Sequence, residues 1–290
     1  MPKPIDQLVD QPINSRHPFS IASALLGDAR PMPWSNLGFW QNTRCYITAC
    51  EQLAQQVGLA ARLKPDDKLL DLGCGKGASL IYWHTAFDIK SITALEIQPD
   101  CVQSIRQARL PALEAVYQGS FAQLPLPSPQ LQQAFDAIVC VDAAYHAQPE
   151  QFLVLVHSAL QPQGRLGYTT LCKSKHWDNS SASYRQKLLK ILTLKLLHVA
   201  YVPECNLLSI SQLDHQLQQA GFSAIDISLL DQPVLQGFAD YMRTHKQRQF
   251  GKTSNQRLDW LKIVMTGQLC RFLARHQLIN YVLVSASRTA

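Results

Sequence analysis

Three glycines stand at alternate positions in residues 68–78, which read Lys-Leu-Leu-Asp-Leu-Gly-Cys-Gly-Lys-Gly-Ala. Glycine is favoured where the backbone takes unusual torsions or approaches a ligand closely. A helix that begins behind such a turn presents unpaired backbone N–H groups, which suit an anionic or polar ligand. The run therefore predicts a strand, a nucleotide-type binding turn and a helix.

Two kinds of nucleotide site fit this run. The spacing of Gly73, Gly75 and Ala78 satisfies the dinucleotide pattern G-x-G-x-x-G/A. Glu96 lies near the distance expected for an acid that binds the ribose. Asp71 stands two residues before the first glycine, where it would repel a pyrophosphate because like charges repel at short range. The acid at this position argues against a dinucleotide.

The pattern Asp71-x-Gly73-x-Gly75-x-Gly77 resembles the first motif of the class I S-adenosylmethionine-dependent methyltransferases. The resemblance implies S-adenosylmethionine as the cofactor, with Asp71 near its ammonium group, directly or through water. Glu96 would bind the ribose hydroxyls, and Ile97 and Gln98 would lie beside the adenine. The cofactor residues that the resemblance implies are Asp71, Gly73, Cys74, Gly75, Gly77, Glu96, Ile97, Gln98, Ser120, Phe121 and Asp142.

Ser120 departs from the family pattern, in which an acidic residue commonly binds the adenine amino group. A hydrogen bond to a charged group contributes about 1.5–3 kcal/mol, against about 1 kcal/mol for a neutral one. The departure therefore predicts a weaker adenine contact, unless Ser120 and Phe121 are only a loop serine and a core aromatic residue.

Residues 135–146 resemble the fourth motif of the same family, and this segment ends in Asp142, Tyr145 and His146. Open α/β sheets bind ligands outside the carboxyl ends of their strands, where these residues would emerge. Many similar small-molecule enzymes carry a histidine near the position of His146. Histidine can act as a general base near neutral pH, so His146 is the first catalytic candidate. Tyr145 is the second and could instead shape the pocket, while His146 could merely cap the next helix.

Strands alternate with helices along most of the chain, which indicates βαβ units and a mostly parallel sheet. The resemblance implies a Rossmann-like α/β fold in which seven strands carry helices on both faces and the last strand is antiparallel. We expect an N-terminal arm and lid helix in residues 1–60. The cofactor-binding domain would follow in residues 61–290, with a helical cap insert at about 174–203. The expected strands are 68–72, 91–96, 115–118, 135–141, 165–171, 224–230 and 281–286.

An aromatic segment precedes the first helix and suggests a binding wall for the methyl acceptor. It resembles the lead-in of enzymes that methylate tocopherols, sterols and macrolides, and aromatic walls suit an apolar acceptor and a sulfonium cation. The alternative is that these rings only anchor the arm on the core. The candidate substrate-binding residues are Trp34, Phe39, Trp40 and Tyr46.

A leucine-rich helix expected over residues 180–202 has three possible roles. It could cap the pocket, touch a membrane surface weakly or form an interface between subunits, so the oligomeric state stays open. A basic run that includes Arg257 and Lys262 is typical of a solvated helix face, and the alternative is that it binds a phosphate or a carboxylate.

Composition narrows the function further. The eight cysteines form no CxxC pair, which argues against a zinc module and a disulfide scaffold. No run of eighteen apolar residues occurs, and the net charge of +6 falls short of a nucleic-acid footprint. The sequence predicts a cytoplasmic, metal-independent enzyme that methylates a small lipophilic or aromatic molecule. RNA methylation and a non-catalytic S-adenosyl ligand-binding protein are the alternatives.

Overall fold

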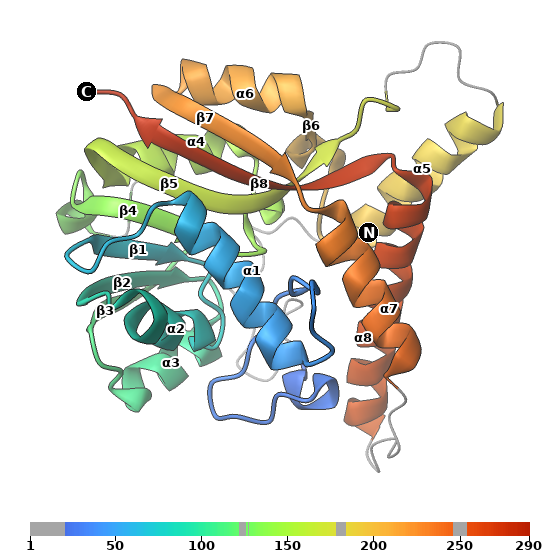
Figure 1. Ribbon diagram of the computed structural model, residues 1–290, viewed down its shortest axis with the longest axis horizontal. Coiled ribbons are helices and arrows are strands. Elements are labelled where there is room, and N and C mark those ends of the chain that lie inside the picture. Colours follow the sequence, from blue (N-terminus) through green and yellow to red (C-terminus); the bar gives the residue numbers. More distant parts are fainter. Residues whose placement is uncertain (1–20, 122–125, 127, 178–183, 246–253) are drawn as a thin grey trace.

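A mostly parallel sheet of eight strands forms the centre of the molecule (Figure 1). The computed structural model describes residues 21–121, 126, 128–177, 184–245 and 254–290. The strand order is β3-β2-β1-β4-β5-β8-β7, and the two-residue β6 pairs with β5. The strands are β1 (Lys68–Leu72), β2 (Ser91–Glu96), β3 (Leu113–Gln118), β4 (Phe135–Cys140), β5 (Leu160–Lys173), β6 (Leu208–Ser209), β7 (Phe222–Leu229) and β8 (Ile279–Arg288).

The strand directions confirm the predicted fold class. β1, β2, β3, β4 and β5 pair in parallel, whereas β8 runs antiparallel to both β5 and β7. The sequence predicted seven strands and missed β6, because two residues are too short to show an alternating pattern. β5 is longer than its predicted range at both ends, because Leu160 pairs with Phe135 of β4 and the pairing with β8 continues to Lys173.

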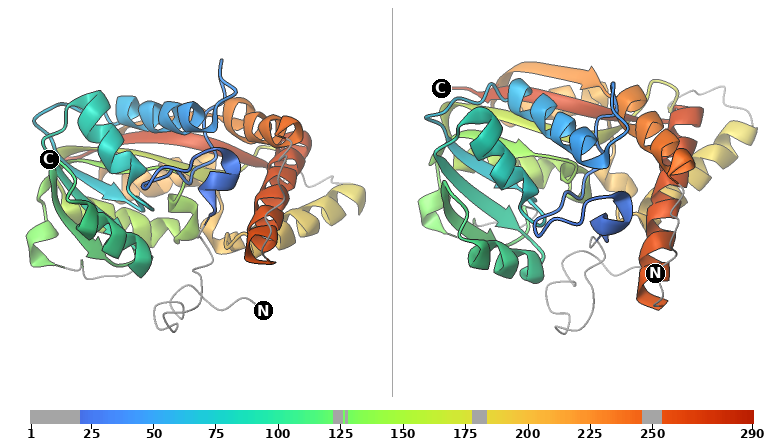
Figure 2. Two further views of the ribbon diagram at one scale, coloured as in Figure 1. Left: turned by 90° about the horizontal axis from the view of Figure 1, so that it is seen from below. Right: turned by 60° about the horizontal axis from the view of Figure 1, so that its bottom comes forward.

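Helices cover both faces of the sheet and one end of it (Figures 1 and 2). Side chains of β1 alternate between two cores: Leu69 joins the cluster that contains Trp83, and Leu70 joins the cluster that contains Phe152. The helices are α1 (Tyr46–Ala60), α2 (Ala78–Phe87), α3 (Pro99–Ala108), α4 (Pro149–Ala159), α5 (Tyr184–Val199), α6 (Ile210–Gln219), α7 (Gly237–Thr244) and α8 (Ser254–His276).

Three helices lie beyond the carboxyl ends of the parallel strands. Figure 1 shows α5, α7 and α8 at this end, away from β3. A π-helical turn, η6 (Asp231–Gln236), leads into α7. These helices stand where an α/β sheet binds its ligands, so they contribute to the site.

The predicted division into an N-terminal arm with a lid helix (1–60) and a cofactor-binding domain (61–290) stays a prediction. Residues 1–20 of the arm lie outside the described residues. α1 lies against the sheet, where Leu53 and Val57 are fully buried. In the helical insert at about 174–203, residues 178–183 are outside the description, and the rest includes α5.

Candidate functional site

A cavity of about 560 Å³ lies at the carboxyl ends of the parallel strands. Binding sites for small molecules commonly enclose about 300–1,000 Å³. Three parts of the chain line it: the loops that follow the strands, the segment before α1, and the helices α5, α7 and α8. The cavity is therefore large enough for ligands that touch both the sheet and the end helices.

The glycine turn forms one end of the cavity. Gly73 and Gly75 line it and have left-handed φ values of 76° and 55°. A Cβ atom added to Gly73 would lie 2.9 Å from the Cβ of Ala143, so any side chain here would separate the loops after β1 and β4. Cys74 and Gly77 are not among the residues that line the cavity. The α-carbon of Gly77 instead packs close to Met32, whose Cε would lie 2.4 Å from an added Cβ.

Glu96 ties the glycine turn to the end of β2. Its Oε2 accepts a hydrogen bond of 2.8 Å from the N–H of Gly75, and its Oε1 accepts one of 2.9 Å from the N–H of Gln98. Burial raises the pKa of Glu96, although both N–H groups oppose that change. Glu96 lines the cavity, as do the other residues predicted around the adenine: Ile97, Gln98, Ser120 and Phe121.

Asp71 lies behind the turn and does not line the cavity. Its Oδ2 accepts hydrogen bonds from the hydroxyl of Ser79 at 2.6 Å and the indole N–H of Trp83 at 2.7 Å. Burial raises the pKa of Asp71 to about 6 despite these two donors. The carboxylate thus fixes α2 against β1, and its contact with a ligand's ammonium group, directly or through water, stays a prediction.

Asp142 joins three parts of the chain at the floor of the cavity. Its Oδ2 accepts a 2.7 Å hydrogen bond from the N–H of Leu37. Its Oδ1 accepts hydrogen bonds from the hydroxyls of Tyr281 at 2.8 Å and Tyr145 at 3.0 Å. Burial raises the pKa of Asp142, and these donors oppose the rise. Asp142 also has a φ of 57°, a conformation that non-glycine residues rarely adopt and that often marks a functional site.

Tyr281 is a cavity residue that the sequence analysis missed. Its only signal is a hydroxyl within the apolar strand β8, where the side chain is fully buried. A buried tyrosine hydroxyl needs a hydrogen-bond partner, and it finds Asp142 and the hydroxyl of Thr169. The sequence could have indicated that Tyr281 needs a partner, but not which one.

His146 lines the cavity at the end of η4 (Ala144–His146). Its Nδ1 lies 3.0 Å from the carbonyl oxygen of Tyr201. Because a carbonyl only accepts hydrogen bonds, this contact assigns the proton of the neutral ring to Nδ1 and leaves the lone pair on Nε2. That tautomer suits a group that takes a proton from a ligand.

Tyr145 is less suited to accept a proton. Burial and the neighbouring carboxylate of Asp142 raise its pKa well above the usual range, so the phenol stays protonated. The backbone carbonyl of Tyr145 accepts a 3.0 Å hydrogen bond from the side-chain amide of Asn206, which supports η4 from behind. Of the two predicted catalytic residues, the geometry favours His146 as a base and Tyr145 as a positioning residue.

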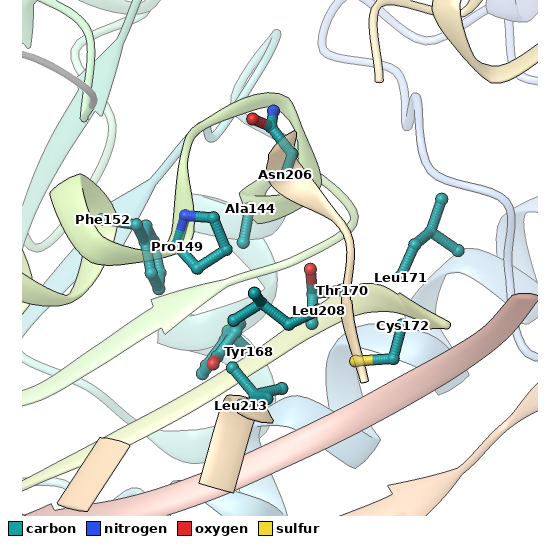
Figure 3. A pocket seen from close by; sticks show the side chains of 10 residues that line it. All are labelled: Ala144, Pro149, Phe152, Tyr168, Thr170, Leu171, Cys172, Asn206, Leu208 and Leu213. Atoms are coloured by element: carbon teal, nitrogen blue, oxygen red, sulfur yellow. The ribbon is translucent and has the colours of Figure 1, made fainter. Parts of the chain in front are cut away.

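A second, much smaller void lies behind η4. Figure 3 shows side chains of β5 and β6 gathered around it, with Ala144 and Asn206 at its upper side. Its volume is about 10 Å³, roughly the space of a single water molecule. This void is a packing gap and cannot hold the ligand.

The predicted aromatic wall is largely absent from the cavity. Tyr46 lines it, whereas Trp34, Phe39 and Trp40 are not among the lining residues. Trp40 stacks on Tyr241 of α7 with ring centroids 4.3 Å apart. Trp34 and Phe39 pack in the core and Trp40 packs against it, so their rings anchor the segment before α1, and substrate contact by these three residues stays a prediction.

Helices form the other end of the cavity with mainly apolar side chains. The sequence analysis considered α5 as a cap but missed the contribution of α8, which carries no motif. Buried Asp259 and exposed Lys262 of α8 also lie along the wall. The apolar residues at this end include Leu196, Leu197, Val199, Leu235, Phe238, Ile263, Met265, Leu269, Cys270 and Leu273.

In the described parts of the chain, no three His, Cys, Asp or Glu side chains gather so that they could hold a metal ion. No helix of the described residues has the length and apolar composition needed to cross a membrane.

Comparison with known proteins agrees with this geometry. The family described as "Methyltransferase domain" matches residues 44–227. Erythromycin 3''-O-methyltransferase of Saccharopolyspora erythraea is 24% identical over 234 residues, which are 79% of this chain and 74% of that protein.

Two solved structures show the same fold. Geranyl diphosphate C-methyltransferase of Streptomyces coelicolor A3(2) has a TM-score of 0.70 at 16% identity, and the match covers 99% of this chain and 100% of the other. Mycolic acid cyclopropane synthase CmaA1 has a TM-score of 0.71 at 17% identity, over 92% of this chain and 94% of the other.

Proposed function

We propose that this chain methylates a lipophilic acceptor and that His146 is the general base. The chain belongs to the methyltransferase domain family, as a class I enzyme that uses S-adenosylmethionine to methylate a small molecule. This proposal rests on the fact that one continuous cavity connects the two binding regions. The cavity runs from the glycine turn and Glu96 to the apolar side chains of α5 and α8. A cofactor at one end and an apolar acceptor at the other would therefore meet without leaving it.

The charges along the cavity favour this cofactor over a dinucleotide. S-adenosylmethionine carries a positive sulfonium, which nearby carboxylates attract, whereas they repel a pyrophosphate. Glu96 and Asp142 supply such carboxylates, and Asp259 adds a third. Among the described lining residues, Lys262 is the only lysine or arginine, which also disfavours the phosphates of RNA.

The chain's own residues have three tasks in this reaction. S-adenosylmethionine supplies a methyl group that is already activated for transfer. Gly73, Gly75 and Glu96 would hold the cofactor, and the apolar side chains would hold the acceptor in line with the methyl group. Such alignment can contribute about 7–11 kcal/mol to lowering the barrier. Nε2 of His146 would take the proton from an acceptor hydroxyl or amine. Such general-base catalysis typically raises the reaction rate by about 10²–10⁴-fold.

The relatives support an acceptor with an apolar skeleton. Their printed names specify erythromycin, which contains a macrolide ring, and geranyl diphosphate, which contains an isoprenoid chain. The cavity suits such an apolar part, because leucine, isoleucine and valine side chains surround a few polar groups such as Thr266.

A matched pair of acceptors tests the proposal. The enzyme is incubated with methyl-labelled S-adenosylmethionine and a phenol that carries an isoprenoid tail, or the same phenol without the tail. We expect kcat/KM to be at least about tenfold higher for the tailed phenol, because each buried CH₂ contributes about 0.8 kcal/mol. Equal rates for both phenols, or label transfer to RNA alone, would contradict a lipophilic acceptor.

A further inference from the structure

One face of α5 exposes apolar side chains to solvent. Tyr184 is 84% exposed, Leu188 55%, Ile191 51%, Leu192 41% and Val199 63%. With 3.6 residues per turn, these five positions fall within about 100° of the helix circumference. The opposite side of α5 carries the buried residues Thr193 and Leu197. The stripe is therefore an outward face and not part of the core.

A second apolar stripe lies on α8. Leu258 is 59% exposed, Leu261 53% and Met265 51%, at the i, i+3 and i+7 spacing of a single helix face. Figure 2 shows α5 and α8 at the same end of the molecule. Val199 and Met265 are exposed and also line the cavity. The two stripes consequently lie at the mouth of the cavity.

Basic residues accompany both stripes. Between Tyr184 and Val199, where every residue is described, α5 has no acidic residue, and its cations are Arg185, Lys187, Lys190 and Lys195. Arg257 and Lys262 flank the stripe of α8. Exposed apolar side chains next to lysine and arginine are typical of helices that lie on the surface of an anionic membrane.

We propose that the stripes of α5 and α8 dock the protein on an anionic phospholipid surface, and that the acceptor enters the cavity from that surface. The second clause rests on the proposed function, whereas the first stands on exposure and charge alone. A second copy of the chain fits this face less well. A twofold interface would place the cations of each α5 near those of its partner, where like charges repel.

Vesicle flotation tests the docking without any acceptor or cofactor. The protein is mixed with vesicles of phosphatidylcholine alone, or with vesicles that also contain phosphatidylglycerol. We expect binding to the anionic vesicles that weakens as salt screens the charges. The double variant Leu188→Asp with Leu261→Asp should lower the partition coefficient at least about tenfold, because it adds charge where side chains enter the interface.

Two further variants separate the apolar and electrostatic parts. Leu59→Asp on α1 alters a leucine that is 57% exposed, about as much as Leu188, and should bind vesicles like the wild type. Lys187→Gln with Lys195→Gln should weaken binding to anionic vesicles by about tenfold or more and leave the phosphatidylcholine result unchanged.

Three results would overturn the docking proposal. The first is that the protein binds both vesicle types equally well. The second is that Leu59→Asp loses as much vesicle binding as the double variant Leu188→Asp with Leu261→Asp. The third is that the protein does not bind vesicles and forms a dimer in sedimentation velocity, which Leu188→Asp dissociates. The last result would assign the face to a second copy. If vesicles bind but the tailed phenol is not preferred, the docking surface stands and the proposed acceptor class fails.

Discussion

The two ends of the cavity are built in different ways. At the glycine turn, backbone groups and buried carboxylates fix the shape, as in the contact between Gly75 and Glu96. At the end formed by α5 and α8, apolar side chains such as Ile263 and Leu269 form the wall without a comparable hydrogen-bond network among the described contacts. The first end can recognise a ligand only at defined positions, whereas the second can accept ligands of similar size and hydrophobicity.

The largest loss of ligand binding should follow when a side chain is added at the glycine turn, the end of the cavity that backbone groups form. Gly75→Arg forces a left-handed residue, at about 1–2 kcal/mol, and fills space where an added Cβ would already lie 3.0 Å from the hydroxyl of Ser35. We expect the affinity for S-adenosylmethionine to fall by about 1,000-fold or more in calorimetric titration. Gly75→Ala carries the same backbone strain with little bulk and should retain weak binding. An arginine variant that binds normally would contradict this account of the turn.

The second-largest effect should be a loss of catalytic rate when His146, between the two ends of the cavity, is replaced. His146→Asn should lower kcat by about 10²–10⁴-fold and leave cofactor affinity unchanged, because it removes the base and not the binding turn. His157→Asn is the matched control, since His157 packs against Phe222 instead of lining the cavity. A change in cofactor affinity with kcat intact would assign His146 to binding.

Asp71→Asn tests how the buried carboxylate behind the glycine turn affects the free energy of unfolding. The folded pKa is about 6 and the unfolded one about 3.9, so the folded state binds the proton more tightly between these values. This group therefore makes the free energy of unfolding fall by about 3 kcal/mol in total as pH rises from below about 3 to above about 7, with about 2 kcal/mol of it between pH 4 and pH 6. Above about pH 7 both states are ionised and the penalty is constant.

Asparagine keeps an oxygen for Ser79 and Trp83 but does not ionise, so the Asp71→Asn variant should lack that fall. Urea unfolding at pH 4.5 and pH 7 measures the difference, with Asp66→Asn as the exposed control. Parallel pH dependence of the variant and the wild type would show that Asp71 does not carry this penalty.

The smallest effect is expected at the apolar end. Leu269→Ala removes part of a wall but no hydrogen bond, so we expect the KM of a lipophilic acceptor to rise by about tenfold or less. Cofactor affinity should not change. Leu229→Ala, at a leucine that is 57% exposed on β7, serves as the control. If Leu269→Ala weakened the cofactor as much as the acceptor, the distinction between the two ends would fail.

The sequence could predict the backbone-built end because its parts are local. The bounds of β1 and β2 agree with prediction; Gly73 and Ser120 reach the cavity from loops that follow strands, and Glu96 reaches it from the last position of β2. The orientation of Asp71 was also open to prediction. It shares the face of β1 with Leu69, and that face meets Trp83.

The sequence could not predict the other end, because its contacts join distant segments. Tyr281 meets Asp142 across 139 positions, and no motif links them. Trp40 could have faced a ligand or the core, since a tryptophan ring buries apolar area equally well in both places. Only the position of α7 decides that Trp40 stacks on Tyr241.

The hydrogen bond from Leu37 to Asp142 has a consequence for the speed of turnover. Asn36 and Leu37 form part of the wall around the cofactor end, and this 2.7 Å contact holds them to the end of β4. Each catalytic cycle has to exchange spent cofactor for fresh. Wherever that exchange displaces the segment before α1, it has to break this contact together with the hydrogen bonds that Tyr46 and Trp40 donate to the carbonyls of Asn36 and Leu37 at 3.0 and 2.7 Å.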